Sequence, residues 1–145
     1  MTASRADVLA RLMASVQPLL ADPEADVVHV EEVEGRVAVR MRQVVRDATT
    51  VWCAPGERTV TFEAYLLPAP PARAEEVYRA ALVRSASGWR VHYALDGEGA
   101  LVLRARVDAE RVDAELVSYV LAEIWDQVEV AFGSLARLAS EPREN

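Results

Sequence analysis

The stretch HYALDGEGALVLRARV, residues 92–107, is the part of this chain that most resembles a cation-binding loop. Asp96 and Glu98 alternate with glycine, as the first ligands of a calcium loop would. A loop of the EF-hand type needs oxygen ligands at alternate positions over about 12 residues and a bidentate Glu at its end. After Glu98 the chain continues GALVLRARV, and the next carboxylate is Asp108. We therefore predict that DGEG is a turn between two strands and that the chain has no metal site.

Histidine is the usual base of nucleophilic catalysis, and the chain has two, His29 and His92. Both fall in the middle of predicted strands. In the predicted registers His29 lies opposite Arg40 and His92 opposite Arg104, and a neighbouring cation disfavours the protonated imidazole. A catalytic triad needs a base that accepts and returns a proton. We therefore predict no catalytic histidine.

The single cysteine, Cys53, lies between Trp52 and Ala54 in a predicted strand, which favours a buried and unreactive thiol. One cysteine excludes a disulfide within the chain and a cysteine-cluster metal site, and it is typical of a reducing cytoplasm. No glycine-rich phosphate loop precedes a predicted helix. These observations predict a cytoplasmic protein that is not an enzyme and has no cofactor.

Arginine is the residue type that points to binding. All 16 basic residues are arginine, although the formal net charge is −7. In the predicted registers, a group of these arginines points away from the core beside an exposed tryptophan and a histidine. The predicted peptide-binding residues are Arg40, Arg42, Trp52, Arg90, His92, Arg104 and Arg106. Such a face suits an acidic or extended partner, because guanidinium groups bind carboxylates in a bidentate geometry.

Two other interpretations of this face are open. In the first, the face is solvated and its arginines pair with Glu31 and Glu63. In the second, Arg90 and Arg106 lie opposite each other as a like-charge pair that a bound anion stabilises, with His92 beside them. Nucleic acid is not an expected partner, because the acidic field of the protein opposes phosphate and few aromatic side chains are available to stack on bases.

Helical periodicity predicts the helices that position this face. Ser4 and Asp7 form a capping-box pattern ahead of an apolar stripe, and Pro18 ends or kinks that helix. The stripe consists of Val8, Leu9, Leu12, Met13 and Val16. A second helix spans residues 72–85. Its predicted core residues are Val77, Ala81 and Leu82.

The last helix is predicted to start near Asp113 and to run through Ala131. Gly133 and Ser134 are expected to bend or fray it. Four aromatic residues are predicted to pack in the core or between helices. They are Tyr78, Trp89, Tyr119 and Trp125.

Period-two alternation predicts three hairpins. The first turns at Glu34-Gly35 and pairs Val33 with Arg36, Glu31 with Ala38 and His29 with Arg40. Its predicted core face consists of Val28, Val30, Val37, Val39 and Met41.

The second hairpin turns at Pro55-Gly56 and buries Val60, Phe62, Ala64 and Leu66. The third turns at Gly97-Glu98-Gly99 and pairs Leu95 with Leu101, Tyr93 with Leu103 and Val91 with Ala105. Gly99 is expected to take the left-handed conformation that this loop requires.

Together these elements predict an α+β fold of two layers, an antiparallel sheet of about five strands with helices on one face, in the order α-β-β-β-α-β-β-α. The other face of the sheet is left to water or a partner. One domain is predicted over residues 1–140, with a disordered tail at residues 141–145. No apolar run approaches the roughly 20 residues that span a bilayer, so no membrane partner is expected.

The stretch EVYRAALVRSASGWRVHYALDGEGALVLRARVD, residues 76–108, resembles the YbjN family, especially its actinobacterial branch. The residues that carry the resemblance are Val77-Tyr78-Arg79, Leu82, Arg84 and Ala94-Leu95-Asp96. It extends over residues 35–138. The chain departs from the family at Ser85, where Asn is typical, and at Arg90 and His92, where small residues are common.

This resemblance implies a fold similar to that of type III secretion chaperones, small acidic proteins that bind extended segments of partner proteins, often as dimers. It therefore implies a non-enzymatic, chaperone-like or regulatory domain with a protein or peptide client, and a homodimer as its own assembly. The family brings no catalytic residues and no cofactor. A small-molecule anion-binding protein, or an enzyme that uses the Arg/His face, is the alternative.

Overall fold

The computed structural model describes residues 3–140, and the predicted disordered tail lies outside them. The N-terminal part of the chain forms α1 (Arg5–Val16), the 3₁₀ helix η1 (Gln17–Ala21), β1 (Val27–Val33), β2 (Arg36–Arg42), β3 (Ala48–Pro55) and β4 (Thr59–Leu67). The remainder forms α2 (Ala74–Ser85), β5 (His92–Leu95), β6 (Leu101–Asp108), the short η2 (Ala109–Arg111) and α3 (Ala114–Ser140). The fold is α+β, as the sequence predicts.

The strands form one antiparallel sheet of six, in the order β1-β2-β3-β4-β6-β5. The predicted number of about five strands, with three before the middle helix, is one too low. Both β3 and β4 pair along their length, so four strands precede α2.

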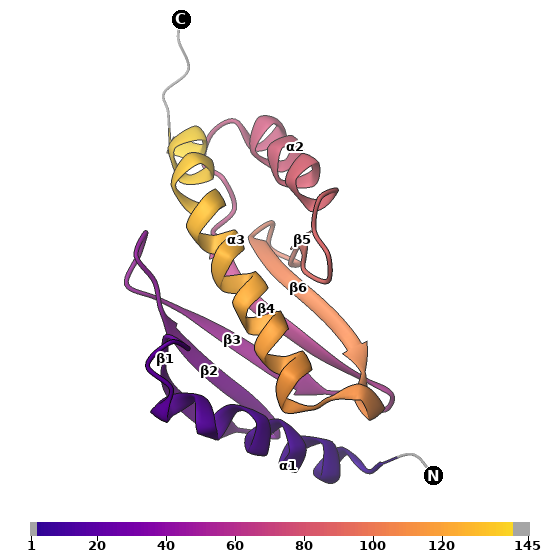
Figure 1. Ribbon diagram of the computed structural model, residues 1–145. Helices are drawn as coiled ribbons and strands as arrows, with labels where there is room; N and C mark the ends of the chain where they lie inside the picture. Colours follow the sequence, from indigo (N-terminus) through magenta and orange to yellow (C-terminus); the bar gives the residue numbers. More distant parts are fainter. Residues whose placement is uncertain (1–2, 141–145) are drawn as a thin grey trace, which may run out of the picture.

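Two helices cover one face of this sheet. Figure 1 shows α3 running diagonally across the strands, with α1 beside it in the same layer. α1 packs against α3, β2 and β3, whereas α2 packs against α3 and β5. Alternate strand residues such as Val39, Phe62 and Leu103 point into this layer and are completely buried. No helix within residues 3–140 is long and apolar enough to cross a membrane.

The first hairpin has the predicted register, with Val33 paired to Arg36, Glu31 to Ala38 and His29 to Arg40. Glu34 and Gly35 both have positive φ, which matches the twist that a two-residue hairpin turn requires. The placement of Val28 in the core is wrong. An irregularity between Val27 and His29 shifts the register, so Val27 is buried and Val28 is 41% exposed.

The third hairpin confirms DGEG as a turn. Leu95 pairs with Leu101 and Tyr93 with Leu103, as predicted. Gly99 has a φ of +84°. The Asp96 carboxylate accepts hydrogen bonds from the backbone N–H groups of Glu98 and Ala100, at 2.8 and 2.9 Å.

The strand before that turn is shorter than predicted, because β5 begins at His92. The paired residues of β5 and β6 therefore include neither Val91 with Ala105 nor Arg90 with Arg106. A carboxylate of α3 instead binds the backbone N–H groups of Arg90 and Val91. It belongs to Glu123.

The helix ends follow local sequence signals. Ser4 and Asp7 form the predicted capping box, and after Val16 the chain tightens into η1 at Pro18. α3 continues without interruption past Gly133 and Ser134 to Ser140, so the helix does not fray at these two residues.

Three predicted core or packing residues are exposed instead. Leu82 is 67% exposed, Trp89 78% and Tyr119 57%. Leu82 lies on the outer side of α2, whereas the buried residues of that helix are Val77 and Ala81. Trp89 lies in the connection before β5, so helical spacing does not apply to it.

A candidate binding surface on the open sheet face

The sheet face opposite α1 and α3 carries the polar half of every strand. One cross-strand row runs over all six strands through directly paired residues. It consists of Glu31, Ala38, Trp52, Glu63, Arg104 and His92. Within the described part of the chain no helix covers this face, which we call the open sheet face.

The arginines of this face differ in their partners. Arg104 forms an ion pair with the paired Glu63, as the solvated interpretation predicts. Arg40, Arg42 and Arg106 are exposed, and among residues 3–140 none of them forms an ion pair. Three unneutralised guanidinium groups on one face are notable in a chain with a formal net charge of −7.

Trp52 is half-buried at the centre of the face. The Arg36 guanidinium lies over its ring, 4.3 Å from the centroid, which is a cation–π contact. Arg36 was absent from the predicted binding residues. Its position follows from the β2–β3 register, in which Ala38 lies opposite Trp52 and Arg36 is the next residue on the same side.

Arg90, His92 and Arg106 meet at one end of the sheet, in a recess of about 480 Å³. Trp89 and Arg111 also line it, together with Val107, Asp108 and Leu116. The single carboxylate of this group, Asp108, is 3.6 Å from the Arg111 Nε. Arg111 lies in η2, a short helix that the strand pattern does not predict, so no sequence signal pointed to Arg111.

The seven predicted residues spread over the sheet from β2 to β5. Trp52, Arg104 and His92 lie in the central row, while Arg40 and Arg42 lie on β2 toward the other edge. His92 also lines the recess just described, together with Arg90 and Arg106.

The histidines and the cysteine lie apart from one another. His29 faces Arg40 as predicted, but its Nε2 is 3.4 Å from the Glu31 carboxylate. His92 faces Arg104. Cys53 is completely buried, as predicted, and desolvation raises the pKa of its thiol to about 12. Among residues 3–140 no three His, Cys, Asp or Glu side chains are placed to hold a metal ion.

Similar sequences come from mycobacteria. An uncharacterized protein of Mycobacterium tuberculosis is 34% identical over 83 residues, which cover 57% of this chain and 45% of that protein. One of Mycobacterium leprae is 31% identical over 103 residues, 71% of this chain and 56% of that protein. The chain thus spans about half the length of the curated relatives it matches. No family model matches, so membership of the YbjN family stays a prediction.

Solved structures give a closer likeness in shape. The Yersinia pestis type III secretion chaperone SycH, solved in complex with a stable fragment of YscM2, superposes with a TM-score of 0.54 at 16% identity, covering 89% of this chain and 99% of SycH. The chain has the fold of a type III secretion chaperone. The HopA1–SchA chaperone–effector complex also matches, at a TM-score of 0.48 and 9% identity, over 87% of this chain and 94% of that one.

Proposed function

We propose that this protein binds an extended, acidic segment of a partner protein on its open sheet face and acts without catalysis. The observation that carries the proposal is a set of exposed arginines, Arg40, Arg42 and Arg106, on the open sheet face. Within residues 3–140 these arginines form no ion pair and no helix covers that face. In an acidic protein this face is where carboxylates of a partner would be attracted.

Trp52 provides the second element of such a surface. Interface energy concentrates in aromatic and arginine side chains, and Trp52 lies beside Arg36 and Arg40 of the neighbouring strand β2. Guanidinium groups bind carboxylates in pairs of hydrogen bonds, so an extended acidic segment across the strands would meet several in succession. The fold likeness to SycH, which was solved with a protein fragment, is compatible with this role.

The test is capture of partners from the native lysate, read by mass spectrometry, on the wild-type chain and on the Trp52→Ala/Arg106→Glu double variant. Arg106 is preferred to Arg104 because Arg104→Glu would set two carboxylates against each other at Glu63. We expect one acidic partner that the wild type retains and the double variant loses. Arg137→Glu, on α3 and thus in the helix layer, is the charge-matched control.

Direct binding then decides the chemistry. A synthetic peptide from the captured partner should bind the wild type and the Arg137→Glu variant equally, and the double variant at least about tenfold more weakly. Equal binding to the double variant would contradict the proposal. So would a partner segment without acidic residues.

A second candidate function is the binding of a small anion in the recess of Arg90, His92, Arg106 and Arg111. The observation that favours it is the gathering of three arginines and one histidine around a space with a single carboxylate. Phosphate or a dicarboxylate should then raise the unfolding temperature, and His92→Ala or Arg106→Gln should reduce that rise. No shift at millimolar anion would exclude this function. The expected homodimer stays a prediction.

A further inference from the structure

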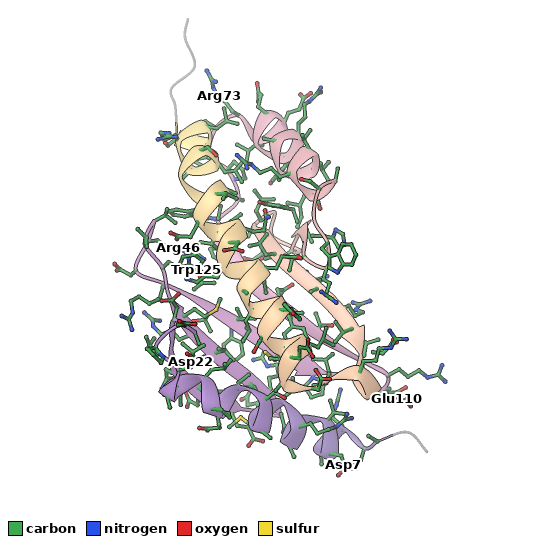
Figure 2. All side chains as sticks on the ribbon, in the orientation of Figure 1. Asp7, Asp22, Arg46, Arg73, Glu110 and Trp125 are labelled. Atoms are coloured by element: carbon green, nitrogen blue, oxygen red, sulfur yellow. The ribbon has the colours of Figure 1, made fainter. Side chains whose placement is uncertain are left out.

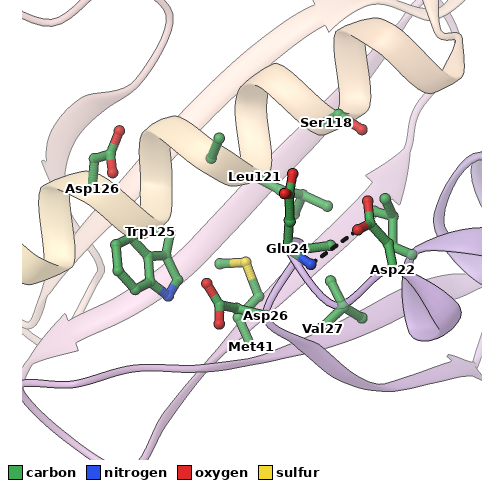
Figure 3. A pocket seen from close by; sticks show the side chains of 12 residues that line it. Asp22, Glu24, Asp26, Val27, Met41, Ser118, Leu121, Trp125 and Asp126 are labelled. Atoms are coloured by element: carbon green, nitrogen blue, oxygen red, sulfur yellow. Dashed lines mark hydrogen bonds between the residues drawn. The ribbon is translucent and has the colours of Figure 1, made fainter.

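A groove of about 420 Å³ lies on the side of the molecule opposite the open sheet face, between α3 and the connection from η1 to β1. Figure 3 shows Trp125 and Leu121 of α3 facing Met41, Val27 and Asp26 across it. Met41, Val27 and Leu121 are almost completely buried, so they form an apolar floor. Ala122, Ser118, Leu19 and Ala25 complete the apolar and small part of the lining. The volume lies within the range of roughly 300–1,000 Å³ that is typical of ligand sites.

The rim of the groove is acidic. Its charged residues are Asp22, Glu24, Asp26 and Asp126, and no arginine or histidine lines it. Among residues 3–140 none of these four carboxylates forms an ion pair. Asp22 and Trp125, both labelled in Figure 2, mark its two sides. The groove is therefore apolar below and negatively charged at its edge.

Both walls are fixed to the same residue of β2. The backbone N–H of Arg42 donates to the Asp26 carbonyl at 2.8 Å, and the Arg42 carbonyl accepts from the Trp125 indole Nε1 at 2.6 Å. The connection from η1 to β1 contains a turn in which the Glu24 N–H donates to the Asp22 carboxylate at 2.9 Å. An occupant would enter a preformed site and would not have to order its walls.

We propose that this groove binds a segment of a partner protein in which a large aliphatic side chain is flanked by arginine or lysine. The aliphatic group would replace water over the apolar floor, and the flanking cations would meet the four unneutralised carboxylates. The acidic segment proposed for the open sheet face would be repelled here. The groove is thus a second interaction surface of opposite charge, and its assignment does not rest on that of the open sheet face.

The probe is a fluorescein-labelled ten-residue peptide with two central leucines between pairs of arginines, and its counterpart has glutamate in place of each arginine. Binding to the full chain is followed by fluorescence anisotropy. We expect the basic peptide to bind and the acidic counterpart not to bind at this groove. The affinity should fall as salt is raised from 50 to about 500 mM, because added ions screen exposed charges.

Two kinds of variant locate the binding. Asp22→Asn/Asp126→Asn removes two rim charges and should weaken the basic peptide about tenfold. Ala122→Trp, at an exposed position of the lining, should block entry while the rim stays intact. Glu57→Gln/Glu110→Gln removes the same charge at exposed carboxylates outside the groove and should leave binding unchanged. The indole N–H resonance of Trp125 should shift when the wild type binds.

The outcomes separate this proposal from the previous one. Trp52→Ala/Arg106→Glu should keep full affinity for the basic peptide even if it loses the acidic partner. Binding that survives both Asp22→Asn/Asp126→Asn and Ala122→Trp would overturn the groove assignment. A wild-type dimer that Ala122→Trp dissociates would also overturn it, since a second copy of the chain would then be the occupant.

Discussion

At the scale of single residues, burial decides the chemistry of the lone thiol. Cys53 is completely buried and its pKa is raised from 9.0 to about 12 by desolvation. We expect native protein at pH 8 to resist alkylation by iodoacetamide and the unfolded chain in urea to react fully, because the thiolate is the nucleophile. Intact mass spectrometry measures both. Rapid labelling of folded protein would contradict the burial.

The same pKa shift predicts a pH dependence of stability. The folded state keeps the Cys53 proton while the unfolded chain loses it above pH 9, so the free energy of unfolding should fall as pH rises from 9 toward 12. Burial also raises the pKa of Tyr93, whose ordinary value is 10, so the thiol contributes most of the decline between pH 9 and 10 and the tyrosine contributes more above pH 10. Urea titrations of wild type and Cys53→Ala should show a smaller decline over that interval in the variant.

Arg46 has a structural role. Its guanidinium donates to the backbone carbonyls of Tyr65 and Leu66 at 2.8 and 2.9 Å and lies over the Phe132 ring. Arg46→Lys loses the planar fork that reaches both carbonyls, and we expect it to lower the free energy of unfolding by about 1–2 kcal/mol. Arg40→Lys, at an exposed arginine without an ion pair, should change it by less than about 0.5 kcal/mol. Equal effects in urea unfolding would contradict this assignment.

The contrast between Arg46 and Arg40 also marks what the sequence could not predict. Alternation placed Arg40 outside correctly, since that depends only on strand period. Arg46 lies in the loop between β2 and β3. Besides the Thr49 hydroxyl, its acceptors are two backbone carbonyls of β4 that no side-chain pattern reveals. The sequence predicts the ion pair of Arg104 only as one of several possible pairings, because the β4–β6 register joins distant parts of the chain.

At the scale of elements, two carboxylates of α3 accept hydrogen bonds from two separate loops. Glu129 accepts from the Gln43 side chain at 2.8 Å and from the backbone N–H groups of Val44 and Val45 at 3.2 Å. Glu123 accepts from the backbone ahead of β5. Helical periodicity predicted which side of α3 is buried, but these contacts depend on where the loops come to lie.

We expect Glu129→Ala to leave three donors without this acceptor and to speed amide hydrogen exchange at Val44 and Val45 about tenfold, equivalent to about 1.4 kcal/mol of lost protection. Asp126→Ala, on the same helix and without a hydrogen bond to that loop, should leave both rates unchanged. Exchange followed by NMR tests this. Similar acceleration in both variants would mean that helix stability, and not the carboxylate, protects the loop.

Local rules account for the turns that the sequence predicts correctly, but not for the errors in the strands. The turns at Glu34-Gly35 and Gly99 were predictable because each needs positive φ, which few residues adopt easily. The irregularity beside Val28 and the late start of β5 were not. β5 starts late where the Glu123 carboxylate of α3 binds the backbone N–H groups of Arg90 and Val91. The irregularity beside Val28 lies at the open end of the first hairpin, where the Asp26 carbonyl accepts from the Arg42 N–H.

At the scale of the whole molecule, two surfaces of opposite charge lie on opposite layers of the fold. Arg40, Arg42 and Arg106 lie on the open sheet face, and the four rim carboxylates lie beside α3. Sites that share no side chains usually behave additively. Arg42 belongs to both surfaces. Its backbone holds both groove walls, while its side chain lies on the open sheet face.

We therefore expect the basic leucine peptide and an acidic peptide from the captured partner to bind the same molecule together. Each should raise the unfolding temperature, and the two shifts should add, because each ligand binds the folded state at its own site. The affinity for either peptide, measured by titration calorimetry with the other at saturation, should change by less than about threefold. Mutual displacement would show that both peptides use one surface. A larger, reciprocal change without displacement would show coupling between the faces, and Arg42, whose backbone joins β2 to both walls, is where that coupling would pass.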